Sequence, residues 1–369
     1  MKKRILLYLF LLLGQASTLI AQVDSLSDPP IQRVSVAALH LHYGSIFAHS
    51  VDVLNTAGAR PLGIHLDFGK QQYGEAAWQK YGCLPRTGLT LAYYDFDNEV
   101  LGRGLTAAYF LEPTFRLSSR WLLAARGAAG LSFLTNPYHP ERNPTNLSYS
   151  MALSAYLSLG ISTYWRLNPQ WSLVFTGDYQ HISNGGVRQP NKGINWPTAS
   201  IGVDYTFQPL TWARPTRHNQ NRDWRSQPPR RDLYLFGGVQ NVSAGESSQF
   251  PIVGGGIAWS KQVTRISSLS AGAETHADFA LREQLERDSL AQLSHVRAGV
   301  LVGHEFLLGK IVFSQQLGVY AFQQTPYYPR LYQRWGLLYR LNPSLSAGFN
   351  LKTHGHIANF WELRLVKHW

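Results

Sequence analysis

Along most of the chain, apolar residues alternate with polar or small ones. Clear examples are the segments 105–118, 171–183, 199–207, 345–355 and 360–369. Because successive side chains of a strand point to opposite faces, this period of two predicts β-strands with one apolar and one polar face. The segments suffice for roughly 12 to 16 strands, and an even number is expected of a closed membrane barrel.

The lengths and ends of these segments favour a membrane barrel. Several have the roughly 9 to 11 residues with which a tilted strand crosses a bilayer. Aromatic residues are abundant, with 11 Trp, 19 Tyr and 17 Phe, and they gather at segment ends like the aromatic girdles of outer-membrane barrels. The last segment ends in Trp369, with Leu365, Leu363 and Trp361 on the same face. We therefore predict an all-β fold, an antiparallel transmembrane β-barrel. The alternative is a secreted β-sandwich.

The first residues have the layout of a secretory signal peptide. A charged start at residues 2–4 precedes an apolar run at 5–13, and small or apolar residues lead to Ala21. This order is typical of a cleaved export signal rather than of a membrane helix. We expect residues 1–21 to be removed and the mature protein to reside in the outer membrane.

Charge and cysteine content narrow the choice of partners and cofactors. The formal net charge is +12, and basic residues at the rim of an outer-membrane barrel can attract the phosphates of lipopolysaccharide. No helix-turn-helix or zinc-finger pattern is present, so we expect no nucleic-acid partner. The single cysteine, Cys83, excludes both an intramolecular disulfide and a zinc site built on cysteines. We expect Cys83 to be a loop or core residue.

Three short matches recur in the same order, two of them at nearly one spacing, which indicates an internal repeat. The pairs are GLSFLTNPYHP at 130–140 with GVYAFQQTPYYP at 318–329, RLNP at 166–169 and 340–343, and HISN at 181–184 with HIAN at 356–359. We predict two related halves, 22–207 and 233–369, joined by a basic, proline-bearing loop or linker at 208–232. The halves could form one large barrel or two small ones, and we favour one.

A candidate site lies at the end of the strand 171–183. Its odd-numbered residues are mostly apolar and should meet lipid, whereas its even-numbered residues are mostly polar and should face the lumen. His181 and Ser183 continue the lipid-facing row. A His–Ser pair two residues apart can reach hydrogen-bond range, so His181 could be the general base for attack by Ser183 on a lipid ester. The alternative, two polar groups at the membrane interface of a non-catalytic strand, is favoured by the local pattern alone, since no G-x-S-x-G elbow is present.

The longer string HISNGGVRQPNKGIN at 181–195 resembles the active-site stretch of the lipid A 3-O-deacylase (PagL-like) / acyloxyacyl hydrolase family of outer-membrane β-barrel proteins. The resemblance covers residues 178–207, and outside them only the barrel pattern is similar. It implies a serine esterase that removes an ester-linked acyl chain from lipid A of lipopolysaccharide. In that family scheme His181 is the base, Ser183 is the nucleophile, and neither a cofactor nor a metal is required.

The resemblance also implies a source of hydrogen bonds for the oxyanion that forms during ester cleavage. The residues in the corresponding stretch are Asn184, Gly186 and Asn191. The chain departs from the family at Asn195, where the motif has a glutamate that orients the histidine. An asparagine can hold an imidazole but stabilises imidazolium less than a carboxylate does. We expect either a slower enzyme with Asn195 as third member or a different acidic partner. Strand parity argues against Asp178 and Asp204 as that partner.

The second half lacks the serine, since Ala358 stands where the first half has Ser183. We expect a polar cluster in its lumen rather than a metal site. The cluster would contain Lys352, His354, His356 and Glu362. Two alternatives to the esterase remain. One is a non-enzymatic, porin-like or structural barrel with a vestigial site, and the other is an outer-membrane phospholipase.

Overall fold

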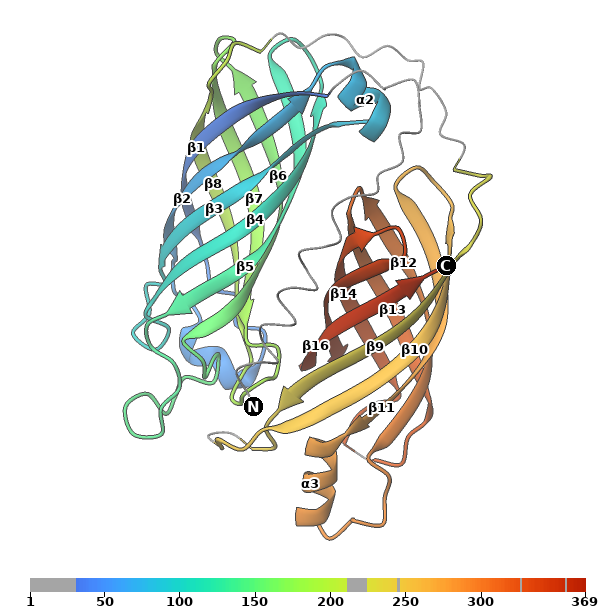
Figure 1. Cartoon of the computed structure of the whole chain (residues 1–369). Coiled ribbons are helices and arrows are strands. Elements are labelled where there is room, and N and C mark those ends of the chain that lie inside the picture. The colour runs from blue at the N-terminus through green and yellow to red at the C-terminus, as the bar shows by residue number, and fades with distance from the viewer. Residues whose placement is uncertain (1–30, 211–223, 244–245, 326, 356) are drawn as a thin grey trace, which may run out of the picture.

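The computed structural model describes residues 31–210, 224–243, 246–325, 327–355 and 357–369. The predicted signal peptide, 1–21, and most of the predicted linker, 208–232, lie outside the described residues. Within them the chain forms sixteen antiparallel strands in two closed rings of eight (Figure 1). The predicted fold class, an antiparallel transmembrane β-barrel, is confirmed, and the strand number lies within the predicted range.

The first barrel contains the strands β1 (Gln32–Gly44), β2 (Leu62–Tyr73), β3 (Leu84–Asp95), β4 (Arg103–Arg116), β5 (Trp121–Leu134), β6 (Leu153–Arg166), β7 (Trp171–Ser183) and β8 (Ile194–Thr206). The second contains β9 (Arg230–Gln240), β10 (Phe250–Gln262), β11 (Ser267–Asp278), β12 (Val296–Leu308), β13 (Ile311–Phe322), β14 (Leu331–Asn342), β15 (Leu345–His354) and β16 (Ile357–His368). Among the described residues, three short helices lie in connections: η1 (Val51–Thr56), α2 (Glu75–Tyr81) and α3 (Phe279–Arg287).

Each barrel closes on its own first and last strands. In the first barrel β1 pairs with β8, from Val36 opposite Thr206 to Gly44 opposite Thr198. In the second barrel β9 pairs with β16. Our preference for one large barrel is therefore wrong. The physical reason is that eight strands already suffice to close a ring, and side chains can fill the interior of a ring of this size. Closure also pairs the backbone groups of the edge strands, which lipid could not hydrogen-bond.

The two faces of the strands differ as the alternation predicted. On β7 the even-numbered side chains from Ser172 to Gln180 are buried in the lumen, while Trp171, Phe175 and Tyr179 are exposed on the outside. The same outward apolar row continues around both barrels, where it forms the lipid-facing band. Among the described residues, none of the helices has both the length and the apolar character needed to cross a bilayer.

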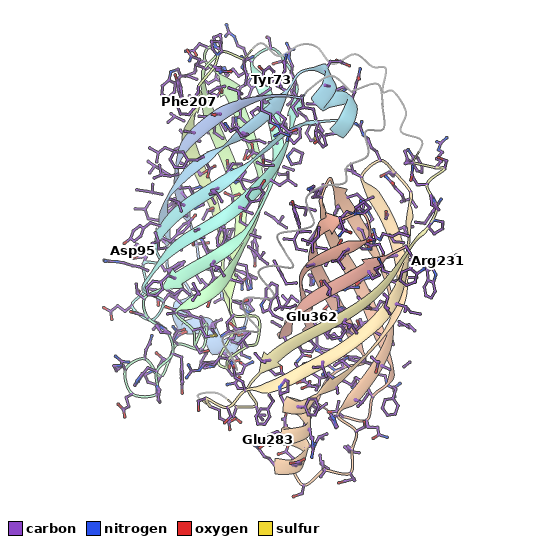
Figure 2. All side chains as sticks on the ribbon, in the orientation of Figure 1. Tyr73, Asp95, Phe207, Arg231, Glu283 and Glu362 are labelled. Atoms are coloured by element: carbon purple, nitrogen blue, oxygen red, sulfur yellow. The ribbon has the colours of Figure 1, made fainter. Side chains whose placement is uncertain are left out.

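The two ends of each barrel carry different connections. Turns such as 117–120 and 167–170 in the first barrel, and 309–310 in the second, are short, whereas connections such as 135–152 are long. The long connections of both barrels, including that with α3, lie toward the lower side of Figure 1. Figure 2 shows the same polarity, with Phe207 at the short-turn end of the first barrel. Outer-membrane barrels have short periplasmic turns and longer extracellular loops.

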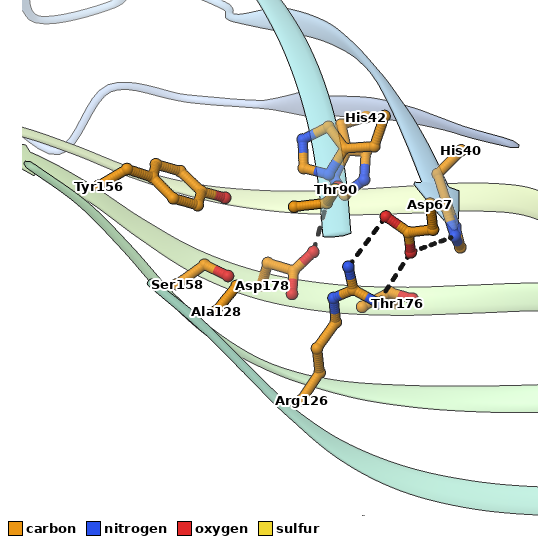
Figure 3. Close-up of a pocket in the computed structure, with 11 residues that line it drawn as sticks. His40, His42, Asp67, Thr90, Arg126, Ala128, Tyr156, Ser158, Thr176 and Asp178 are labelled. Carbon is orange, nitrogen blue, oxygen red and sulfur yellow. Dashed lines mark hydrogen bonds and ion pairs between the residues drawn. The ribbon is translucent and has the colours of Figure 1, made fainter. Parts of the chain in front are cut away.

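The first lumen is filled by a network of charged side chains, part of which is drawn in Figure 3. Arg126 on β5 forms ion pairs with Asp67 on β2, at 2.8 Å, and with Glu112 on β4, at 3.1 Å. His40 Nε2 lies 3.5 Å from Asp67, and all of these groups are largely shielded from solvent. Buried charges need such partners because an unpaired charge in a poorly solvated interior is costly.

Replacing Arg126 by methionine is expected to destabilise the first barrel by about 3–5 kcal/mol, because two buried carboxylates lose their shared partner. Urea unfolding of the detergent-folded protein, followed by tryptophan fluorescence, measures this change. The matched control is Arg103→Met, whose pair with Asp95 is exposed at 62% and 46%. The control should lose no more than about 1 kcal/mol. Equal midpoints for the two variants would contradict a structural role for the Arg126 network.

Cys83 lies between α2 and β3, at the short-turn end, which agrees with its expected place in a loop. Burial raises the pKa of its thiol to about 11, and the charge of Arg265 opposes this only in part. The thiol is therefore protonated at neutral pH and is a poor nucleophile, since thiolate is the reactive form.

Candidate active site

A β-hairpin builds the candidate site. β7 ends at Ser183 and β8 begins at Ile194, and the two strands pair with His181 directly opposite Asn195. Directly opposite side chains on one face of an antiparallel pair lie within reach of each other. The register thus brings together three residues that the sequence singled out.

Hydrogen bonds join these three residues in a line. His181 Nε2 lies 2.9 Å from Ser183 Oγ, and His181 Nδ1 lies 2.7 Å from Asn195 Oδ1. With the imidazole proton on Nδ1, His181 donates to Asn195 and its Nε2 accepts the Ser183 hydroxyl proton. A nucleophile, a base and a group that orients the base are the parts required for nucleophilic catalysis.

A second histidine, which the sequence did not indicate, extends the line. Asn195 Nδ2 donates to His49 Nδ1 at 3.0 Å, and this bond turns Asn195 Oδ1 toward His181. The segment that carries His49 is held against β8 because the Phe47 N–H donates to the Asn195 carbonyl oxygen at 2.8 Å. Finding His49 from sequence would have required placing β1 beside β8, which our single-barrel prediction did not do.

The site lies on the outer side of the barrel. Asn195 belongs to the same outward row of β8 as Pro197, Ala199 and Ile201, whose alternate neighbours are buried. Ser183 is only 3% exposed and Asn195 9%, so the chain shields both from solvent.

The two aspartates that strand parity excluded as partners of His181 face the lumen. Asp204 is 2% exposed and pairs with Arg86 at 2.7 Å, and Asp178 lies 3.6 Å from His42 Nδ1. In the described part of the chain, neither carboxylate forms a hydrogen bond or an ion pair with His181, whose ring nitrogens contact Asn195 and Ser183. Asn195 is the residue that hydrogen-bonds to His181 Nδ1.

The loop 184–193 contains the three expected oxyanion donors. The Asn184 N–H donates to Asn191 Oδ1 at 2.8 Å, and the Gly186 N–H donates to Asn184 Oδ1 at 3.0 Å. The Asn184 side-chain amide also donates to the Arg188 carbonyl oxygen at 2.7 Å. By contrast, Asn191 Nδ2 is buried and has no acceptor among the described residues. Of the three residues, Asn191 is the one whose side-chain N–H group has no hydrogen-bond acceptor within the loop.

The second barrel has Ala358 at the position that matches Ser183. Its buried serine–histidine pair lies elsewhere, where Ser346 Oγ is 2.6 Å from His368 Nε2 and His368 Nδ1 is 2.6 Å from Asp232 Oδ1. Lys352, His354 and Glu362 are buried in its lumen, as expected, whereas His356 lies outside the described residues. Lys352 Nζ donates to Glu274 Oε1 at 2.8 Å, so the lysine is part of a buried ion pair. In the part of the chain that the structure describes, no group of three or more His, Cys, Asp or Glu side chains is arranged to hold a metal ion.

The fold and this geometry define a transmembrane β-barrel with a Ser–His–Asn constellation on its outer face. Two family models match the chain, one in each barrel. Residues 63–204 match lipid A 3-O-deacylase (PagL), and residues 230–367 match the acyloxyacyl hydrolase C-terminal domain (PagL_C). The chain belongs to the PagL family of lipid A 3-O-deacylases and acyloxyacyl hydrolases.

Solved structures similar to the chain include outer-membrane barrels. The outer-membrane enzyme PagL is 14% identical with a TM-score of 0.34, over 45% of this chain and 97% of that chain. Neisserial surface protein A (NspA) is 12% identical with a TM-score of 0.32, over 47% of this chain and 97% of that chain. No curated protein sequence matches the chain.

Proposed function

We propose that the protein is an outer-membrane serine esterase that removes an ester-linked acyl chain from lipid A. The observation that carries the proposal is the hydrogen-bonded line Ser183–His181–Asn195 on the lipid-facing side of the first barrel. The family match to lipid A 3-O-deacylase supports the substrate class.

In the proposed reaction, Ser183 Oγ attacks the ester carbonyl carbon while His181 Nε2 takes the hydroxyl proton. The imidazolium that forms keeps its Nδ1–H bonded to Asn195 Oδ1. It then gives the Nε2 proton to the leaving sugar oxygen, and the acyl group remains on Ser183. Water, deprotonated by the same Nε2, releases the fatty acid and restores the serine.

We assign the stabilisation of the carbonyl oxyanion to the side-chain amide of Asn191. Its Nδ2 is the buried donor without an acceptor in the described residues, and its Oδ1 is anchored by the Asn184 N–H. An anchored donor needs little reorganisation when charge develops on the oxygen. Asn184 and Gly186 then act by shaping the loop.

The same proposal places the site near the outer surface of the outer membrane. The loop 184–193 belongs to the long-connection end, which is the extracellular end in such barrels. Arg188 is exposed in this loop and can attract a lipid phosphate. Residues 1–21 act as the signal peptide, 22–207 as the deacylase half, 208–232 as the linker and 233–369 as the degenerate half.

Mass spectrometry of lipid A after incubation with the full-length, detergent-folded protein tests the proposal. We expect the loss of one ester-linked hydroxyacyl mass. An unchanged lipid A from a protein with folded barrels would contradict it. Hydrolysis of phospholipid instead, dependent on calcium, would identify a phospholipase. A porin-like function is disfavoured because each ring has eight strands, and side chains fill the interior of a barrel of this size.

Asn195→Ala is expected to lower kcat by roughly 10²- to 10⁴-fold, because the imidazole loses the group that fixes its tautomer and orientation. Steady-state hydrolysis of lipid A by purified variants measures this effect. Asn195→Asp is the matched comparison, since it keeps an acceptor and adds a charge that stabilises imidazolium. It should be at least as active as the wild type. An alanine variant within threefold of the wild type would remove Asn195 from the mechanism.

A further inference from the structure

The loop that follows Ser183 lies against the second barrel. Gly185 faces the indole of Trp361, and Gly186 faces the backbone carbonyl oxygen of Asn359, both on β16. A Cβ atom added at either glycine would overlap these groups. The Gly-Gly pair therefore allows the second barrel to approach the candidate active-site loop closely.

The backbone of the two glycines gives a second reason for the pair. Gly185 has φ +64° and Gly186 has φ +89°, in the left-handed region that residues with a Cβ rarely adopt. The same two glycines thus allow both the sharp turn of the loop and its close contact with β16.

A hydrogen bond fixes the other part of the loop to the second barrel. The Gln189 N–H donates to Asn241 Oδ1 at 3.0 Å. Asn241 is 5% exposed, and its Nδ2 donates to the Ser243 carbonyl oxygen at 2.8 Å, so its own turn orients the amide. An acceptor from the second barrel therefore receives a backbone donor of the loop two residues before Asn191.

Trp361 is held in place on the second barrel. It belongs to the outward row of β16, where Leu363 is 75% exposed, but Trp361 itself is only partly exposed. Its ring packs edge-on against Phe349 of β15, with centroids 5.2 Å apart. Trp361 is thus a fixed side chain against which Gly185 packs.

We infer that the second barrel is the docking surface that orders the loop 184–193, with Trp361 and Asn241 as positioning residues. This inference rests on the proposed function, because the loop carries the assigned oxyanion donor, Asn191. A loop with two adjacent glycines has many accessible conformations. Docking selects one of them before substrate arrives, which is what a preorganised oxyanion site requires.

Kinetics of purified full-length variants on lipid A test the positioning role. Trp361→Ala and Asn241→Ala should each lower kcat about tenfold or more, with KM within about twofold, because oxyanion bonds act mainly in the transition state. Trp361→Phe keeps a ring and should restore most of the activity. Leu363→Ala, on the same outward row of β16, is the control and should match the wild type.

A disulfide measures the docking without reference to activity. In a Cys83→Ser background, Gln189→Cys paired with Asn241→Cys should form an intramolecular disulfide in outer membranes, read as linked peptides by mass spectrometry. Gln189→Cys paired with Ser344→Cys, in the short-turn end of the second barrel, should not.

The outcomes separate the two proposals. Absence of the 189–241 disulfide overturns the docking, whatever the activity. An active wild type whose Trp361→Ala and Asn241→Ala variants are equally active overturns the positioning role and leaves the esterase intact. An inactive wild type, together with formation of the disulfide in the double-cysteine variant, supports the docking and overturns the esterase.

Discussion

Ser183→Ala is expected to lower kcat for lipid A hydrolysis by roughly 10⁴- to 10⁶-fold, the range in which removing a serine nucleophile falls. The reason is that Ser183 is the proposed nucleophile, and its Oγ lies 2.9 Å from His181 Nε2, the proposed base. Without it, only binding and oxyanion stabilisation remain to assist attack by water. The rate of release of the hydroxy fatty acid measures the effect directly.

Two controls make this result specific to the site. Ser119→Ala, in a short turn at the other end of the first barrel, should retain full activity. A fluorophosphonate probe should label the wild type and Ser119→Ala but not Ser183→Ala, since the probe reacts with an activated serine. If Ser183→Ala kept more than a tenth of the activity while folded, another residue would have to be the nucleophile.

His181→Ala is expected to have an effect of similar size, roughly 10⁴- to 10⁶-fold on kcat, because nucleophile and base act as one unit. The variant also has its own signature. Added imidazole should restore part of the rate by entering the space that the side chain leaves, and it should do nothing for Ser183→Ala. Steady-state assays with and without imidazole measure both effects.

The control for the histidine substitution is His304→Ala, on β12 of the second barrel. Its ring packs against Phe306 and takes no part in the proposed reaction. It should therefore retain wild-type activity. Equal losses in His304→Ala and His181→Ala would point to general instability rather than to a missing base.

The parts of the site that could be predicted are those set by local geometry. Strand alternation placed Asp178 in the lumen and His181 on the same face as Asn195, and the structure agrees. Ser183 hydrogen-bonds to His181, but the chain covers it. Asn195 lies fourteen residues from His181 in one hairpin, so the same alternation placed it on the correct face. Period-two patterns carry this information because each side chain's direction depends only on its own strand.

The parts of the site that the sequence did not predict depend on which strands, far apart in the chain, pair or pack together. His49 reaches Asn195 across 146 positions, and it does so because β1 closes against β8. Trp361 reaches Gly185 from the other barrel. Alternation gives the face of a strand but not its neighbour at the point of closure, so neither contact was expected, and the single-barrel preference was wrong for the same reason.

Under the proposed function, the position of Ser183 and His181 on the outer side of the barrel has a kinetic consequence. A nucleophile reached from the side of the barrel meets its substrate by lateral diffusion in two dimensions. The variable that sets its turnover is then the mole fraction of lipid A in the surrounding bilayer or micelle, rather than moles per litre of solution. Spreading the same amount of lipid A among more inert amphiphile slows such an enzyme, so an apparent KM measured in one detergent belongs to that mixture as much as to the protein.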